Sequence, residues 1–213
     1  MKIAHPTLPA SLIPLLDAAD FLVEEDTISG ALVEDTWLTT DDLEHASIIE
    51  SRLSRVDFSS VNVSRFDVMD VEFKGCNFTA TKFPDSTWRR VVIEGARCSG
   101  MHVANSSLKH TVFKNCKLEL VNFRFSELEN VVFEDCAIEE VDFYDATLRN
   151  VEFVGCTIKN ITFMGAKMFN VDVSKSTLDD IKGVNTLKGV TMSYDQILGI
   201  APLLAAGAGI RIK

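Results

Sequence analysis

The sequence has no long apolar run. None of its uninterrupted apolar stretches reaches the roughly 18 residues that a membrane-spanning helix requires. The first residues, 1–6, also lack the long apolar core of a secretory signal peptide. We therefore expect a cytoplasmic protein without a membrane partner.

Catalytic and ligand-binding motifs are missing as well. The histidines are few and scattered: His5, His45, His102 and His110. No glycine-rich phosphate loop follows a strand pattern, no cysteine–histidine spacing fits zinc, and no nucleophile elbow is present. We expect a protein that is not an enzyme and that has no cofactor and no metal site.

What the sequence does contain is a repeat of five residues. From Ile48 to Leu178 every fifth residue is apolar without a break. Two residues before each of these stands a small or β-branched residue, with Phe66 and Met101 as the large exceptions, and the other three positions are mostly polar. A period of five fits neither an α-helix nor a flat strand, and it indicates a solenoid.

The repeat resembles that of the pentapeptide-repeat family, whose unit is Ala-(Asp/Asn)-Leu-x-x with Phe often at the centre. Val-Asp-Phe-Ser-Ser at 56–60, Cys-Asn-Phe-Thr-Ala at 76–80 and Val-Asp-Phe-Tyr-Asp at 141–145 fit this unit closely. Only a minority of the units carry Asp or Asn at the second position, which faces outward. The resemblance implies an all-β solenoid, a right-handed quadrilateral β-helix with four repeats in each coil.

Four repeats of five place positions one coil apart on top of one another, and the sequence shows such columns. Phe113, Phe133 and Phe153 form one of them. A second inward column contains four of the five cysteines, Cys76, Cys116, Cys136 and Cys156, while Cys98 occupies a central core position. We expect buried, reduced thiols that pack as small apolar residues, because no histidine or carboxylate is expected in the interior to complete a metal site.

The two ends of the chain depart from the repeat. Residues 1–45 hold ten carboxylates against a single lysine, Lys2, and we expect an acidic cap or partner-binding arm, with a short helix at 11–18 and a first coil near Ala31. The repeat domain spans 46–182. In residues 183–213, Ser193 and Gln196 form a capping box that predicts a helix, and residues 210–213 alternate like a short strand.

The predicted C-terminal helix is apolar on more than one face, so the end of one rod cannot cover all of it. The helix resembles the C-terminal helix of gyrase-protecting pentapeptide-repeat proteins, which implies a helix that both caps the rod and joins two rods. We therefore predict a homodimer through this helix, with Leu198, Leu203 and Leu204 in the interface.

Outward positions suggest a surface for another partner. Val92, Val112 and Val132 form one apolar column, and residues of a second apolar group lie on neighbouring sides: Phe125, Tyr144, Met164 and Phe169. A basic belt over 74–117 adjoins an acidic belt over 119–145. The acidic belt contributes further candidate residues: Glu127, Glu129, Glu139 and Asp142. Asn130, Asn150 and Asn170 are expected to stack as a corner ladder that satisfies turn backbones.

These features leave two hypotheses for the function. The first is a rod-shaped protein-interaction scaffold whose partner the sequence does not name. The second, implied by the resemblance to quinolone-resistance members, is a DNA mimic that binds DNA gyrase or topoisomerase. Neither hypothesis involves direct contact with nucleic acid. A mimic needs carboxylates spaced along the rod as phosphates are along a duplex, and here basic residues interrupt them.

Overall fold

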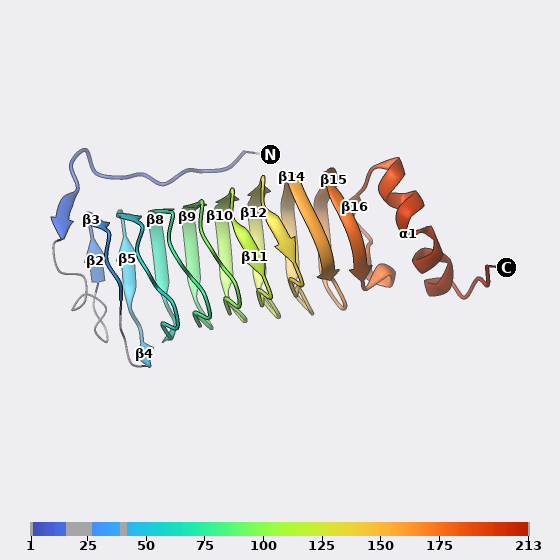
Figure 1. The fold of residues 1–213 in the computed structure, drawn as a ribbon, viewed down its shortest axis with the longest axis horizontal. Helices are drawn as coiled ribbons and strands as arrows, with labels where there is room; N and C mark the ends of the chain where they lie inside the picture. Colours follow the sequence, from blue (N-terminus) through green and yellow to red (C-terminus); the bar gives the residue numbers. More distant parts are fainter. Residues whose placement is uncertain (1, 16–26, 39–41, 213) are drawn as a thin grey trace.

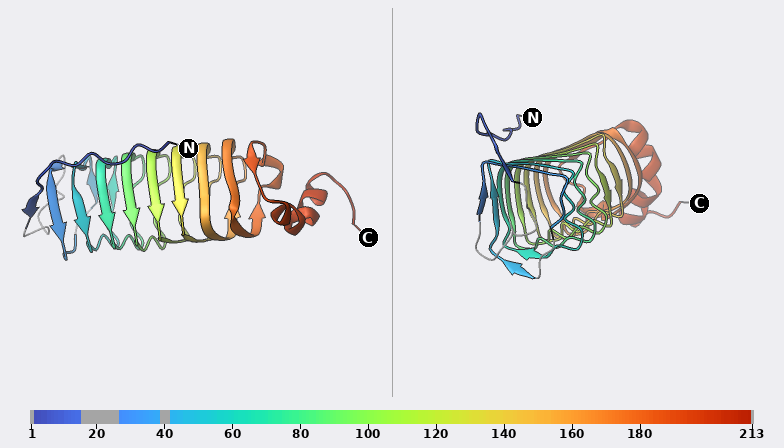
Figure 2. Two further views of the ribbon diagram at one scale, coloured as in Figure 1. Left: turned by 90° about the horizontal axis from the view of Figure 1, so that it is seen from above. Right: turned by 60° about the vertical axis from the view of Figure 1, so that its left-hand side comes forward.

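The computed structural model describes residues 2–15, 27–38 and 42–212, and they form one parallel β-solenoid with an α-helix at its C-terminal end (Figure 1). The view along the rod shows a four-sided cross-section (Figure 2). The strands are β1 (Ile13–Leu15), β2 (Thr27–Ser29), β3 (Ala31–Glu34), β4 (Leu43–Glu44), β5 (Ser47–Ile49), β6 (Arg52–Ser54), β7 (Val63–Ser64), β8 (Asp67–Lys74), β9 (Thr87–Glu94), β10 (Ser107–Lys114), β11 (Lys117–Glu119), β12 (Glu127–Glu134), β13 (Ala137–Glu139), β14 (Thr147–Thr162), β15 (Lys167–Lys182) and β16 (Val190–Thr191). A 3-10 turn, η2 (Val184–Thr186), and the helix α1 (Tyr194–Gly207) complete the chain.

The strand register confirms the predicted coil. β9 pairs in parallel with β10, which pairs with β12, so that Trp88, Leu108 and Leu128 lie one above another at the predicted coil interval. The same interval aligns β12 with β14. Four five-residue units therefore make each turn of the rod.

The corners of the coils explain a sequence preference within the repeat. The fifth residue of nearly every described unit turns the chain with a positive φ, as in Asn150 at 52° and Gly155 at 67°, with Lys175 as an exception. Glycine adopts this left-handed region freely, and asparagine and aspartate tolerate it better than other residues. This is why these three types recur at the corners of the later coils, for example at Asn115, Asp135 and Asn170.

The core is a closed column of apolar side chains, as the repeat predicted. The rings of Phe113, Phe133 and Phe153 stack with centroids 5.0 and 4.7 Å apart. Phe123 and Phe143 stack at 5.0 Å on another side, and the ring of Phe133 meets both of them edge-on. Rings packed in both geometries fill the interior and add to the free energy gained from their burial.

The cysteines are buried and free, as expected. The structure adds a detail that the repeat did not predict, because four thiols also donate to a carbonyl of the preceding coil. Cys116 Sγ lies 3.3 Å from Ile93 O, and Cys156 Sγ lies 3.3 Å from Phe133 O. Burial raises the pKa of the Cys76 thiol to about 11, so this thiol stays neutral at physiological pH.

The helix α1 caps the C-terminal end of the rod by continuing the bonding of this cysteine column. Ser176 Oγ, in the same column, donates to Phe153 O at 3.0 Å. One coil later the donor in this column is Gln196 Nε2, which donates to Val173 O at 2.8 Å and to Ser176 O at 2.7 Å. Gln196 Oε1 also accepts from Ser193 N, so the predicted capping box is present. One glutamine thus starts the helix and satisfies the last carbonyls of the rod.

The described start of the N-terminal segment leaves the end of the rod, while residues 16–26 of the expected acidic cap lie outside the described residues. From β1, which pairs with β3, residues 2–12 run along the outside of the rod (Figure 1). Thr7 N donates to Asp70 Oδ1 at 2.9 Å, and Ala4 N donates to His110 Nδ1 at 3.3 Å. We call residues 2–12 the strap. The carboxylate of Asp70 reaches the strap because bonds from Arg90 hold it in place, and they keep its pKa below the usual range.

Other expectations for the two ends need correction. Residues 13–15 form β1 instead of a helix, and residues 16–18 lie outside the described residues. Pairing at the regular coil interval begins at Thr27, which pairs with Ser47, ahead of the expected start at Ala31. Residues 210–212 are not a strand, since Ile210 N donates to Ala205 O at the end of α1, and residue 213 lies outside the description. No helix in the described part of the chain is long and apolar enough to cross a membrane.

Candidate interaction surfaces

Three of the predicted surface residues come together on one side of the rod. The rings of Phe125 and Tyr144 meet edge-on with centroids 5.7 Å apart, and the guanidinium of Arg124 lies over the Tyr144 ring at 4.7 Å. Met164 follows Tyr144 by one coil in the same column and is 48% exposed, while Phe125 is 51% exposed. We call Arg124, Phe125, Tyr144 and Met164 the aromatic patch.

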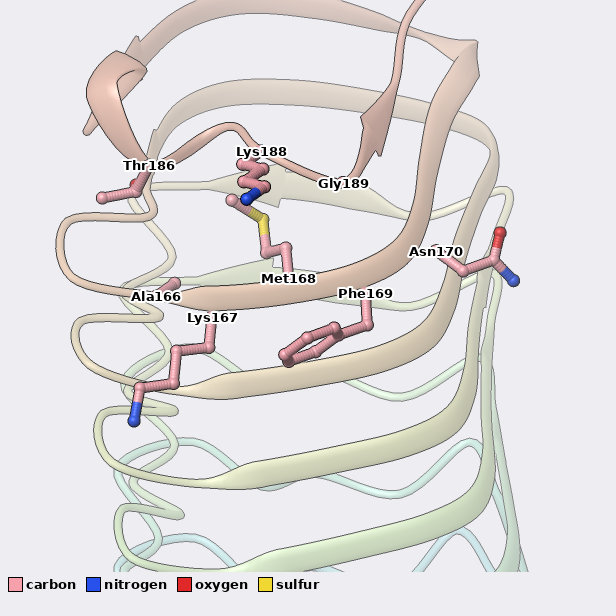
Figure 3. Close-up of a pocket in the computed structure, with 8 residues that line it drawn as sticks. All are labelled: Ala166, Lys167, Met168, Phe169, Asn170, Thr186, Lys188 and Gly189. Atoms are coloured by element: carbon pink, nitrogen blue, oxygen red, sulfur yellow. The ribbon is translucent and has the colours of Figure 1, made fainter.

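Phe169 lies apart from the aromatic patch. It projects from β15 on the adjacent side of the rod, where the guanidinium of Arg149 covers its ring at 4.3 Å. Its ring is 48% exposed and lines a pocket at the end of the rod (Figure 3).

The valine column is less accessible than the sequence suggested. Val92 and Val132 are half-buried, but Val112 is only 8% exposed. Burial of an outward side chain requires cover from outside the coil. The strap passes close to this position, because its Ala4 N donates to His110 Nδ1, two residues before Val112. The prediction of a continuous apolar stripe open to a partner is therefore wrong at Val112.

The candidate carboxylates do not share one face. Glu127 and Glu129 lie on β12, and Glu139 lies on β13. Asp142 lies on a further side, where its backbone pairs with that of Asn122 in an isolated β-bridge. Lys109 Nζ is 3.2 Å from Glu129, and Arg124 Nε is 3.7 Å from Asp142. The acidic belt therefore encircles the rod and is partly neutralised by basic partners.

The predicted dimer residues differ in exposure. Leu198 is 55% exposed and Leu203 is 40% exposed, whereas Leu204 packs against the core at the rod's end. The sequence analysis did not select two further exposed residues of α1, Tyr194 and Ile197, which are 77% and 40% exposed. Ile197 and Leu198 follow Tyr194 by three and four positions, which places all three on one outer face of the helix.

The three asparagines stack as expected, but their bonds join one side-chain amide to the next, whereas bonds to the turn backbone were expected. Asn150 Nδ2 donates to Asn130 Oδ1 at 3.0 Å, and Asn170 Nδ2 donates to Asn150 Oδ1 at 2.9 Å. The sequence analysis missed Arg124, Arg149 and the end pocket. The cation–π pairs were open to prediction, because Arg124 with Tyr144, and Arg149 with Phe169, each occupy the same column in successive coils.

Within the described ranges, no group of three or more histidine, cysteine, aspartate or glutamate side chains is arranged to hold a metal ion. The residues gathered in the aromatic patch and around Phe169 are aromatic, cationic and apolar. This arrangement suits binding.

The central coils match a known family. Residues 95–163 match the family described as a pentapeptide repeat region. The coils are pentapeptide repeats. No curated protein matches the chain in sequence.

Several solved pentapeptide-repeat structures are similar to this chain at low identity. Full-length QnrB1, a plasmid-mediated fluoroquinolone resistance protein, is 18% identical over 86% of this chain and 99% of its own, with a TM-score of 0.40. HetL from the cyanobacterium Nostoc sp. strain PCC 7120, a protein involved in heterocyst differentiation regulation, is 13% identical over 82% of this chain and 92% of its own, with a TM-score of 0.32. Rfr23 from the cyanobacterium Cyanothece 51142 is 18% identical over 57% of this chain and 91% of its own, with a TM-score of 0.30. The coil register, and not these likenesses, carries the fold assignment.

Proposed function

We propose that the protein is a non-enzymatic scaffold that binds another protein through the side of its pentapeptide-repeat rod. The aromatic patch supports this proposal most directly. Phe125 and Met164 are about half exposed, and Arg124 is held between the two aromatic rings. Arginine, methionine and aromatic residues are enriched at the centres of protein interfaces. The rigid coil fixes their positions, so little conformational entropy is lost on binding.

A photo-crosslinker tests this contact. Benzoylphenylalanine in place of Phe125 should give one specific adduct in the native host, and the identified partner, once purified, should bind the wild-type protein. Tyr144→Ser should weaken that binding about tenfold or more, because it removes a ring at the centre of the patch.

The control crosslinker replaces Asn105, which is exposed at the same corner one coil earlier. Equal adducts from positions 105 and 125, or unchanged binding by Tyr144→Ser, would place the interface elsewhere.

We further propose that two rods join through the outer face of α1. Tyr194, Ile197 and Leu198 leave this face largely apolar, and a two-fold contact would bury it on both subunits at once. Leu198→Glu should then produce a monomer with an intact rod, as seen by light scattering and circular dichroism. Leu120→Glu is the matched control, because Leu120 is similarly exposed (57%) on the side of the rod. A wild-type chain that is monomeric at micromolar concentration contradicts the dimer.

The alternative, a DNA-mimicking binder of DNA gyrase or topoisomerase, receives less support from the geometry. A mimic of duplex DNA presents negative charge along its length, whereas the described carboxylates of the acidic belt encircle the rod, and four of them (Glu119, Glu129, Glu134 and Asp142) face basic partners. A supercoiling assay with and without a quinolone distinguishes the two functions. We expect no inhibition of gyrase and no protection from the drug.

A further inference from the structure

The C-terminal end of the rod contains a local defect in the repeat. β15 pairs with β16 through Val171 and Val190, an interval one position shorter than the regular coil. The side between η2 and β16 is therefore too short for the repeat, and it forms turns where every earlier coil has an extended unit.

This defect leaves strand bonds unmade. At the same corner of the first coils, Glu50 N donates to Met69 O of the next coil. The equivalent acceptor for Asn170 is Gly189 O, but Val171 N takes it at 3.1 Å. The described 184–189 backbone thus provides no acceptor for the Asn170 N–H. A free donor on a strand edge is a site where another chain can add.

A pocket of about 640 Å³ opens beside this edge (Figure 3). Its lining is mainly apolar, and its residues are Ala166, Lys167, Met168, Phe169, Asn170, Thr186, Lys188 and Gly189. Gly189 is required here, because a Cβ at this position would lie 2.4 Å from Met168 O. We call this the end pocket. Two lysines give its mouth a positive charge, while its interior suits a bulky apolar group.

The end pocket is continuous with the asparagine ladder, since Asn170 belongs to both. The ladder uses one N–H and one lone pair of the Asn150 amide. The other N–H and the other lone pair still have the capacity to bond a passing backbone. The ladder bonds hold the amide planes in place, so an extended chain lying along this corner would meet pre-oriented donors and acceptors.

The same corner already binds an extended chain in the earlier coils. The strap lies along it and donates its backbone N–H groups to Asp70 and His110. Those two residues are two coils apart, about 9.6 Å at ordinary strand spacing. The donors Thr7 and Ala4 are three positions apart, which spans about 10 Å in an extended chain. The corner and an extended backbone therefore have matching repeats.

We propose that the corner from Asn130 to the end pocket is a binding site for an extended segment of a partner protein. The segment continues the path of the strap toward the C-terminal end of the rod. One bulky apolar side chain occupies the end pocket, and an adjacent acidic residue faces Lys167 and Lys188. The asparagine amides bond the backbone of the residues that follow the apolar anchor. This site is separate from the aromatic patch and does not depend on it.

The test uses the full chain and a fluorescein-labelled, acetylated peptide, Glu-Phe-Ala-Pro-Ala-Gly, with fluorescence anisotropy as the measurement. The proposal expects saturable binding. Replacing the peptide's Phe by Ser should weaken binding about 30-fold, since the anchor supplies most of the affinity. Equal binding of both peptides, or no binding up to millimolar concentration, overturns the proposal.

Two pairs of variants locate the site. Asn150→Gly should weaken peptide binding about threefold or more, whereas Asn160→Gly, at another corner with the same φ of 52°, should not change it. Lys188→Glu should weaken binding about fivefold, and Lys175→Glu, exposed at a different corner, is the control for net charge. If each variant and its control bind the peptide alike, the peptide lies elsewhere and the assignment is wrong.

Discussion

A single hydroxyl in the interior offers a stringent test of the packing. Thr111 is fully buried, and it pairs in the strand register with Val91 and Val131. Its Oγ1 has no hydrogen-bond partner among the described residues. A buried hydroxyl without a partner costs about 1–3 kcal/mol, because its bonds to water are lost and not replaced. Thr111→Val changes this hydroxyl to a methyl group of nearly the same shape.

We expect Thr111→Val to raise the free energy of unfolding by about 1–3 kcal/mol. For a chain of this length that corresponds to an increase of about 2–12 °C in the unfolding temperature. Thermal unfolding followed by circular dichroism measures it, with calorimetry to show whether the coils unfold together. Methyl for hydroxyl also fits the column, whose other members at this level are valines.

Thr81→Val is the matched control. Thr81 is equally buried, but its Oγ1 donates to Phe78 O at 2.9 Å, so the same substitution removes a bond and should lower stability by about 0.5–1.5 kcal/mol. Opposite signs for the two variants support the reasoning. If Thr111→Val is neutral or destabilising, the Thr111 hydroxyl has a hydrogen-bond partner such as water, and water enters the interior.

Three more predictions follow from single contacts. Gln196→Ala should lower the free energy of unfolding by about 1–3 kcal/mol, because the carbonyls of Val173 and Ser176 lose their donor. It should also expose α1 to proteolysis, and unchanged protection of α1 would contradict the capping role. Cys76, whose pKa is raised to about 11, should not react with a thiol reagent at pH 8 until denaturant is added, and rapid native labelling would refute its burial. Since bonds from Arg90 lower the pKa of Asp70, its contribution to stability is present above pH about 4 and is lost as the pH falls further. Hydrogen exchange of Thr7 should accelerate in that range, and Asp70→Asn should abolish the pH dependence.

Much of this architecture was predictable because equivalent contacts recur in every coil of the repeat. One inward position in every five, from Ile48 to Leu178, predicted the coil, its columns and the stacked phenylalanines. Each inward position meets nearly the same neighbours in the next coil, so the sequence indicates the same packing several times. The asparagine ladder and the Cys column were predictable for the same reason, since positions one coil apart must lie side by side.

The strap and the end pocket were not predictable because each depends on a contact that occurs once. Pro6 and Pro9 favour an extended chain in the strap, but they do not say where that chain lies. The position of the strap depends on Asp70. In the sequence this residue resembles any other surface carboxylate, but it is only 4% exposed in the structure. The end pocket arises from one missing position before Val190, where the apolar frame had already faded at Gly183. Both features lie along the corner at which Asp70 and His110 bond the strap, so under the proposal variation outside the repeat changes what the rod binds while the coils stay intact.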